Sequence, residues 1–428
     1  MPFIVMNIQA NKPYIKYLNI KTSMNKLKLF LLMSISFFCM AGFAQKKEIS
    51  AARDNVKAGN NLTQAQASME KLLKDSVNRG NLKIWNILYD AVRKQYEQGN
   101  EKLYLKQAYD TAQLFNLTRQ LFVVAQNMDS VEMVPDRKGR VRIEYRKQHA
   151  DYLGKIRQNL YSGGLWFIRK NRFPEAYSLL DQYLHCASIP LFASYNYREK
   201  DKLIPTVAFW AVYCGYKMKN PQATLHHSYI ALKDTTHYNY MLQYLAETYK
   251  LEKDTVRYVD CLQEGFKNSP SFPFFFPRLV EHYMEKNELD SAMNVVNEAL
   301  LVDSVNTTYL LTKSSILLNQ GKNEECFDIC KSLIAKNDSL SEAYLNAGLS
   351  CFNRAIMLDK NSQKLRKKHD EINALYKQAL PYLEKYRKLE PNEVGKWSLP
   401  LYTIYLNLNM GKEFDEIDKV MNNNRNNK

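Results

Sequence analysis

Adjacent histidines are the first candidates for chemistry in this chain, because imidazole binds metal ions and transfers protons near neutral pH. His226 is followed by His227, and His185 is followed by Cys186. Neighbouring residues on a helix point about 100° apart, so neither pair is expected to share a metal ion. The sequence also lacks a G-x-x-x-x-G-K-[ST] loop, a G-x-S-x-G elbow and an H-E-x-x-H helix. We therefore predict no catalytic residue, no bound metal and no cofactor, and hence no enzyme.

The cysteines do not form a ligand set either. Cys326 and Cys330 lie at i and i+4, on one helical face, but there is no second pair at metal-ligand spacing. Buried, unreactive thiols are the first interpretation of the cysteines that follow residue 44, and one disulfide is the alternative if the chain is exported. These cysteines are Cys186, Cys214, Cys261, Cys326, Cys330 and Cys351.

The first 44 residues have the pattern of a secretory signal peptide. A basic stretch, Met24–Lys28, precedes an apolar stretch, Leu29–Met40. The apolar stretch is shorter than the ~20 residues that cross a bilayer, and Gly42 and Ala44 supply the small residues of a cleavage site. We predict cleavage after Ala44 and export to the periplasm or cell envelope, with an uncleaved anchor as the alternative. Residues 1–23 lack such a pattern, so translation is expected to start at Met24.

Length and composition indicate a folded, elongated or multidomain chain. It has 428 residues, 46% hydrophobic and 24% charged, which suits two or three domains or one long array. Its 14 glycines and 13 prolines are few for a protein of strands and tight turns. Residues 1–44 hold five lysines and no acid, so the chain from Gln45 onward has a net charge of +11 instead of +16. This charge permits acidic partners or anionic surfaces without selecting one.

A period of 34 residues runs through the second half of the chain, in windows that begin at Asn239, Pro273, Thr307 and Ser341. Small or apolar residues recur at fixed positions, so that the two helices of a pair, and successive pairs, approach closely. Position 8 is Ala246, Val280, Ser314 and Gly348; position 20 is Tyr258, Ala292 and Cys326; position 27 is Gly265, Ala299 and Leu333. A single pair cannot bury its apolar face, so the pairs are expected to stack.

This pattern resembles the tetratricopeptide repeat (TPR). The matching residues are Leu279, Tyr283, Leu289, Ala292 and Ala299 in one window and Leu311, Gly321 and Asp338 in the next. The resemblance implies an all-α fold, a right-handed α-solenoid of helix pairs, over roughly residues 150–420. It also implies a scaffold whose concave face holds a peptide or helix of another protein. Export argues against nucleic acid as a partner and leaves membrane association open.

The rest of the sequence divides around this array. Residues 45–135 are expected to be helical, as divergent repeats or an N-terminal cap. Residues 129–147 break the helical pattern, and Val141, Ile143 and Tyr145 within them alternate as in a strand. Residues 136–156 are assigned as a basic, irregular segment that leads into the array. The array is predicted over residues 157–428, with helix pairs near 157, 204, 239, 273, 307, 341 and 397. A polar, helical insertion at about 360–378 is expected to lengthen the second helix of its pair.

Two motifs have a structural and a functional interpretation. Gly163 and Gly164 fall where helix packing needs small residues, and a flexible loop is the alternative. The aromatic run Phe272–Phe276 lies between two repeats, where rings fill the seam, and an exposed binding patch is the alternative. We favour the structural interpretation of both.

Two basic clusters are candidates for binding anions such as lipid headgroups or acidic glycans, although a solvated face explains such runs equally simply. The first consists of Arg137, Lys138, Arg140, Arg142, Arg146 and Lys147, and the second, in the insertion, of Lys364, Arg366, Lys367 and Lys368. Some TPR proteins hold acidic tails with basic residues at positions 5 and 9 of the first helix. These positions are Gln243, Pro277, Leu311 and Leu345, and Glu247, Glu281, Ser315 and Leu349, so we predict no such clamp.

The candidate contact surface lies on the first helices of the windows at Thr307 and Ser341. Positions 2, 5, 9 and 12 of a TPR helix pair face the concave side, and five of these eight residues are large and apolar. They are Leu311, Leu318, Leu345, Leu349 and Phe352. An amphipathic helix laid in the groove would match them. The alternative is self-coverage, in which the insertion or the last helix pair folds back over the groove.

Overall fold

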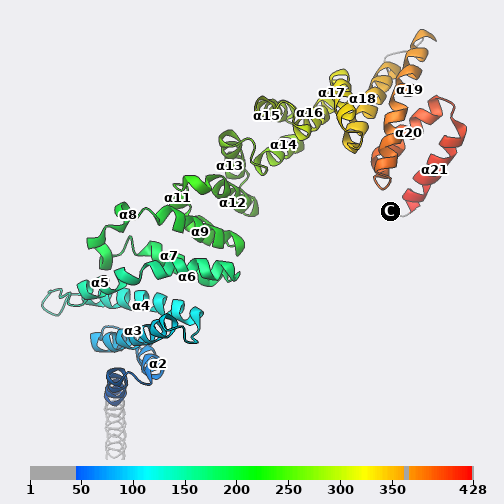
Figure 1. The fold of residues 1–428 in the computed structure, drawn as a ribbon. Helices are drawn as coiled ribbons and strands as arrows, with labels where there is room; N and C mark the ends of the chain where they lie inside the picture. Colours follow the sequence, from blue (N-terminus) through cyan, green and yellow to red (C-terminus); the bar gives the residue numbers. More distant parts are fainter. Residues whose placement is uncertain (1–44, 361–365, 427–428) are drawn as a thin grey trace, which may run out of the picture. The chain divides into compact units, whose positions relative to one another are not determined.

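The computed structural model describes residues 45–360 and 366–426, and every regular element in these two ranges is helical. The predicted all-α fold of consecutive helix pairs is confirmed. The chain divides after Asp234 into two compact units, which we call the N-terminal and the C-terminal unit (Figure 1). Over the part of the chain that is described, no helix is long and apolar enough to cross a membrane. The expected signal peptide, residues 1–44, lies outside the described residues.

In the N-terminal unit, long helices pack against their successors in chain order: α2 on α3, α3 on α4, α4 on α6, α6 on α7 and α7 on α9. The unit begins with a helix over residues 45–58. It continues with α2 (Leu62–Leu73), η1 (Ser76–Asn78), α3 (Leu82–Tyr104), α4 (Thr111–Glu132), α5 (Arg146–Ile156), α6 (Gln158–Arg169), α7 (Phe173–His185), η2 (Pro190–Tyr195), α8 (Tyr197–Lys200), α9 (Ile204–Lys217), α10 (Pro221–His226) and α11 (Ser228–Ala231).

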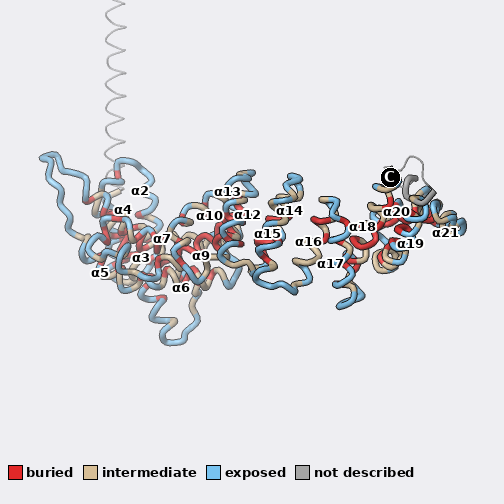
Figure 2. Tube along the Cα trace, turned by 90° about the horizontal axis from the view of Figure 1, so that it is seen from above, coloured by how far each residue is buried: buried red, intermediate tan, exposed pale blue. Residues whose placement is uncertain are grey.

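The C-terminal unit is a series of helix pairs. After η3 (Thr235–His237) it contains α12 (Tyr238–Leu251), α13 (Thr255–Asn268), α14 (Phe275–Glu285), α15 (Leu289–Val302), α16 (Thr307–Asn319), α17 (Asn323–Lys336), α18 (Ser341–Lys360), α19 (Arg366–Leu389), α20 (Val394–Asn407) and α21 (Gly411–Asn426). The windows at Thr307 and Ser341 begin with the first residues of α16 and α18. In both units the buried residues follow the inside of the helix stack, and the exposed ones its outside (Figure 2).

Small residues set the spacing between helices, as the repeat pattern predicted. A Cβ atom added to Gly265 of α13 would lie 2.3 Å from the ring of Phe275, which begins the next pair. A Cβ atom added to Gly348 of α18 would lie 2.5 Å from Leu383 of α19. These contacts leave no room for a side chain, so glycine at these positions allows the helices to approach.

Both motifs with alternative interpretations are structural. Gly163 and Gly164 are buried in α6, and added Cβ atoms would lie 2.6 Å from Phe115 and 2.5 Å from Leu180. In the aromatic run, Phe274, Phe275 and Phe276 are buried. The ring centroid of Phe276 lies 4.6 Å from that of Tyr309, the first aromatic residue of the next pair. The rings fill the seam between repeats.

The structure changes the predicted bounds of the basic segment and of the insertion. The irregular segment predicted near residues 129–147 corresponds to the loop between α4 and α5. The basic segment assigned to residues 136–156 is irregular only in its first half, because α5 begins at Arg146 and buries His149, Ala150 and Leu153 on one face. No strand forms at Val141 and Ile143, which lie in a loop. The insertion lengthens α19 at its start, as predicted, and α18 continues to Lys360 as well. Lys364 of the second basic cluster lies outside the described residues.

Candidate functional site

The basic segment that was predicted to bind anions is the loop between α4 and α5, which projects from the N-terminal unit (Figures 1 and 2). Its base is fixed by two acidic residues of α4. The buried carboxylate of Glu132 accepts hydrogen bonds from the backbone N–H groups of Glu144 and Tyr145. Asp129, also buried, pairs with Arg146 at 2.6 Å. Arg146 is therefore part of the loop's anchor and not of an open anion site.

The tip of this loop combines exposed cations with exposed apolar residues. Arg140 pairs with Asp136 at 3.0 Å, and the backbone N–H groups of Arg140 and Lys138 hold the pKa of Asp136 below its usual value. Val141 and Ile143 are 48% and 43% exposed. The other predicted cations are all exposed: Arg137, Lys138, Arg142 and Lys147. The loop thus carries the exposed cations Arg137, Lys138, Arg140 and Arg142 beside exposed apolar side chains, whereas Lys147 lies in the first turn of α5.

The five apolar residues of the predicted contact surface lie on two neighbouring helices, α16 and α18, and all five are partly buried. Leu345, Leu349 and Phe352 pack against the core formed by α18, α19 and α20, and Leu318 packs against the core between α16 and α17. The ring of Phe352 lies 6.0 Å from that of Tyr376, which belongs to the insertion. Phe352 therefore contributes to the contact with α19, while the leucines keep part of their surface exposed.

Asn346 fixes the distance between α16 and α18. Its buried side-chain amide donates to the hydroxyl oxygens of Ser314 at 3.0 Å and Ser315 at 2.9 Å. Both serines also donate to the carbonyl of Leu311 one turn earlier. A buried polar group with satisfied partners specifies one packing arrangement, so the leucine-bearing faces of the two helices are held in a fixed register.

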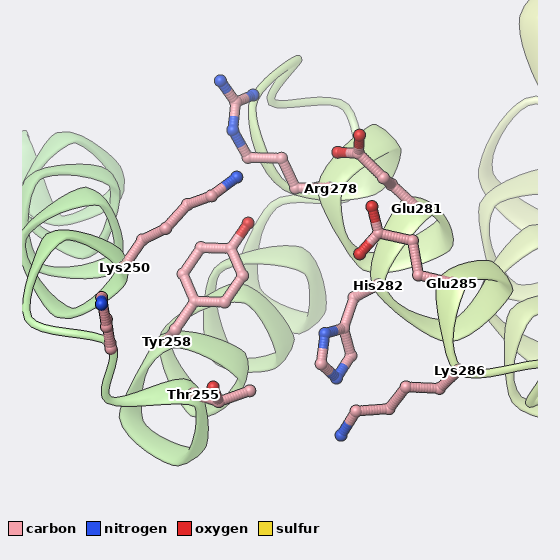
Figure 3. A pocket seen from close by; sticks show the side chains of 9 residues that line it. Lys250, Thr255, Tyr258, Arg278, Glu281, His282, Glu285 and Lys286 are labelled. Atoms are coloured by element: carbon pink, nitrogen blue, oxygen red, sulfur yellow. The ribbon is translucent and has the colours of Figure 1, made fainter.

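A small hollow lies at the start of the C-terminal unit, between the α12–α13 turn and α14. It encloses about 280 Å³, and Figure 3 shows Tyr258 between Lys250 on one side and His282 and Glu285 on the other. Arg278 and Glu281 complete its rim. Arg278 and Lys250 occupy positions 6 and 12 of their windows. The prediction that no clamp for acidic tails exists considered positions 5 and 9 only. Carboxylates lie beside them, so the hollow has mixed charge.

The cysteines are buried free thiols, as predicted. In α17, the hydrogen bond between Cys326 and Cys330 raises the pKa of Cys326 and lowers that of Cys330. Burial raises the pKa of Cys214 to about 12. A protonated, buried thiol is a poor nucleophile and a poor metal ligand.

A larger cavity, of about 810 Å³, lies in the N-terminal unit where α7 meets the end of α10. Its lining combines two acidic residues, histidines and cations with the apolar side chains of Leu184, Ile204 and Ile230. The charged groups and histidines of the lining are Asp181, Asp201, His185, Arg198, Lys202, His226, His227 and Lys233. The sequence pattern had pointed to His185, His226 and His227 as candidates, which were rejected on helical spacing, and it gave no signal for the other groups.

Asp181, His226 and His227 converge at the wall of this cavity. The Nε2 atom of His227 lies 2.7 Å from Asp181 Oδ1, and that of His226 lies 3.8 Å from it. Burial raises the pKa of Asp181, but the hydrogen bond with His227 and the nearby histidines outweigh it, so the pKa lies below its usual value. The carboxylate is therefore ionised and available as a ligand or hydrogen-bond acceptor at neutral pH.

The expectation that adjacent histidines diverge is wrong at this position, because it assumed a continuous helix. α10 ends at His226 and α11 begins at Ser228, with His227 at φ −109° and ψ 10° between them. The hydroxyl of Ser228 donates to the carbonyl of Leu225 at 2.8 Å, a local bond that competes with the helical ladder. The break turns both imidazoles toward Asp181.

Comparisons with known proteins give only distant similarities. No family model matches the chain, and no curated protein matches it. Among solved structures, it is similar to the C-terminal part of a TPR repeat-containing protein from Cytophaga hutchinsonii, with 10% identity over 60% of this chain and 93% of that one and a TM-score of 0.42. It is also similar to the human IFIT1 dimer with m7Gppp-AAAA (12% identity, 80% and 72% coverage, TM-score 0.34) and to yeast Tom70 (13%, 73% and 61%, 0.29). Similarity at this level assigns no ligand or partner to the chain.

Proposed function

We propose that this chain is a non-enzymatic scaffold that binds another protein on the first helices of its C-terminal repeats. The observation that supports the proposal is the partly buried, partly exposed leucine surface of α16 and α18, formed by Leu311, Leu318, Leu345 and Leu349. Asn346 holds these two helices together, so the surface is preorganised, and preorganisation lowers the entropic cost of binding. An amphipathic helix with apolar residues at i, i+3/i+4 and i+7 fits such a surface.

The proposal places the scaffold in the cell envelope, after export and removal of residues 1–44. The basic and apolar stretches before Gln45 support this setting. Intact-mass measurement of the exported protein tests it. A mature form that begins at Gln45 is expected, and a form that retains Leu29–Met40 would indicate an anchor.

A paired substitution tests the binding surface. The variant Leu345→Lys with Leu349→Lys is expected to abolish capture of the partner that the unmodified protein retains from envelope extract. Both leucines are partly exposed, so the lysine stems can keep the core contacts while the charges reach water, and thermal unfolding is expected to change little. The control is Leu301→Lys with Val302→Lys, at the exposed end of α15, where the side chains are 87% and 61% exposed. It is expected to capture the same partner.

The outcomes separate binding from packing. If the insertion and α20 already fill the groove, the Leu345 and Leu349 lysines become buried charges, and the melting temperature falls by several degrees. Unchanged capture with unchanged melting would refute the leucine surface as the contact.

A second candidate function rests on the projecting loop between α4 and α5. Exposed cations beside exposed Val141 and Ile143 suit the surface of an anionic membrane, where each Lys or Arg contributes roughly 1 kcal/mol and apolar side chains enter the headgroup region. In this function the protein is a surface-associated module of the envelope. The two functions are compatible, because they use different units of the chain.

Vesicle binding tests this candidate. We expect co-sedimentation with vesicles that contain anionic lipid, weakening as salt is added, and none with neutral vesicles. The variant with glutamine at three loop positions should lose it, and a variant with glutamine at three exposed lysines near α2 should keep it. The loop residues are Arg137, Lys138 and Arg142, and the control residues are Lys57, Lys71 and Lys74. Equal loss in both variants would point to net charge instead of the loop.

A further inference from the structure

The cluster of Asp181, His226 and His227 has the composition and spacing of a divalent-metal site. One carboxylate oxygen and two imidazole nitrogens, one atom from each residue, lie within 4.8 Å of one another. In a tetrahedral zinc site with bonds of about 2.0–2.2 Å, neighbouring ligand atoms are about 3.3 Å apart. The distances from Asp181 Oδ1, 2.7 Å to His227 and 3.8 Å to His226, lie on either side of this value. Small side-chain rotations would therefore place all three atoms around one ion.

The surroundings fix one ligand and leave the others room to adjust. The side chain of His227 is 10% exposed, that of Asp181 is 41% and that of His226 is 61% exposed. The rings of His226 and His227 pack edge to face with centroids 4.3 Å apart. Asp181 comes from α7 and the histidines from the break after α10, so an ion at this point would join two successive helix pairs.

The cavity beside the cluster can supply the remaining ligand. Three protein ligands and an open fourth position distinguish exchangeable zinc sites from closed structural ones. Arg198, Lys202 and Lys233 line the same cavity, and the one further carboxylate in the lining, Asp201, is paired with Arg157, so an anionic group such as a carboxylate is favoured there over a neutral one. His185 lies one turn from Asp181 on α7 and forms a hydrogen bond with Gln126 at 2.8 Å.

Against the sequence-based expectation, we propose that Asp181, His226 and His227 bind one Zn²⁺ ion, with a water molecule or an anionic group from the cavity as the fourth ligand. Two imidazoles and one carboxylate form a ligand set that first-row cations such as Zn²⁺ prefer. The site is independent of the leucine surface and of the basic loop, so it stands whether or not either proposed function does.

Isothermal titration calorimetry with zinc chloride tests the site, on untagged protein from which metals have been removed with a chelator. One ion per chain is expected. His226→Ala and Asp181→Asn are each expected to weaken binding by about tenfold or more, because even the outer partners of metal ligands contribute about 10- to 100-fold. The matched control is His369→Ala, at an exposed histidine of α19. It is expected to bind zinc as the unmodified protein does.

Urea unfolding and Co²⁺ absorption distinguish a lost metal ligand from a lost fold and from binding by thiols. Because the His226 side chain is mostly exposed, His226→Ala is expected to leave urea unfolding of the metal-free protein unchanged, which separates a lost ligand from a lost fold. Co²⁺ in place of Zn²⁺ is expected to give the visible absorption of a tetrahedral site without thiolate charge-transfer bands. Absence of one-to-one binding, unchanged affinity in both ligand variants, or thiolate bands from the buried cysteines would overturn the proposal.

Discussion

Arg157 in the N-terminal unit and Arg278 in the C-terminal unit both lie against aromatic rings, but their surroundings differ. Arg157 is stacked between the rings of Tyr183 and Tyr197, 3.6 and 3.9 Å from their centroids. It pairs with Asp201 at 2.6 Å and also donates to the carbonyl of Tyr183. Its side chain is only 6% exposed. The guanidinium thus joins the start of α6 to the irregular segment around α8.

Arg278 makes the same kinds of contact, with a ring, a carbonyl and a carboxylate, but at the surface. It lies 3.8 Å from the centroid of one ring, that of Phe274, and donates to the carbonyl of the same residue. Its nearest carboxylate partner, Glu247, is 3.9 Å away, and its side chain is 36% exposed. Both units contain close-packed glycines and buried polar groups, so these features do not separate them. The two arginines differ in burial: Arg157 is a buried ion pair where the repeat is irregular, whereas Arg278 lies at the surface of a regular repeat.

The largest expected effect comes from removing the negative partner of each arginine. Asp201→Asn leaves the buried Arg157 without a counter-charge, and we expect it to lower the free energy of unfolding by about 3–5 kcal/mol. The matched change Glu247→Gln, at a half-exposed pair, is expected to cost less than about 1 kcal/mol. Urea unfolding of both variants measures the difference. Equal losses would show that the two arginines are not energetically distinct.

The two units also contain histidines whose pKa values are lowered to different extents by burial. Burial, and then the charge of Arg93, lower the pKa of His149 to about 4 from a normal value of 6.5. The folded state therefore keeps His149 neutral, whereas the unfolded chain protonates it below pH 6.5. The contribution of His149 to the free energy of unfolding is fully present above pH 6.5 and is lost as the pH drops toward 4, by about 3 kcal/mol. His149→Phe preserves the ring contact with Tyr89, whose centroid is 4.0 Å away, and is expected to remove this acid sensitivity.

The matched variant in the C-terminal unit is His282→Phe. Burial and Lys286 also lower the pKa of His282, but this side chain lies at the rim of an open hollow, and a smaller effect is expected. The measurement is the urea midpoint of each variant across the acid range. A His149→Phe variant as acid-sensitive as the unmodified chain would contradict the assignment.

The two units also differ in how far the sequence predicted them. In the C-terminal unit, the 34-residue period located α16 and α18 at their first residues, because small residues such as Gly348 recur where helices touch. In the N-terminal unit, the ion pair of Arg157 and Asp201 joins residues far apart in the sequence, and no periodicity signals it. The break between α10 and α11 at His227 interrupts the helix, so the convergence on Asp181 could not be read from helical spacing. The leucine surface was predicted by position, but its partial burial depends on tertiary contacts.

The smallest expected effect tests how firmly helices touch in each unit, through glycine-to-alanine changes. A Cβ on Gly215 of α9 would lie 2.4 Å from the backbone nitrogen of Thr224, so α10 itself must move. A Cβ on Gly348 would lie 2.5 Å from the Cγ of the buried Leu383 side chain and 3.3 Å from its backbone nitrogen, so the side chain must shift but the backbone less than at Gly215. Alanine favours a helix over glycine by about 1 kcal/mol, which offsets part of either clash. We expect a net loss of about 2 kcal/mol for Gly215→Ala and about 1 kcal/mol for Gly348→Ala. Gly395→Ala, in α20 with no atom within 4 Å of the added Cβ, is the control and should be neutral or stabilising in urea unfolding. A loss at Gly348 as large as that at Gly215 would show that the repeats of the C-terminal unit pack as rigidly as the irregular helices before them.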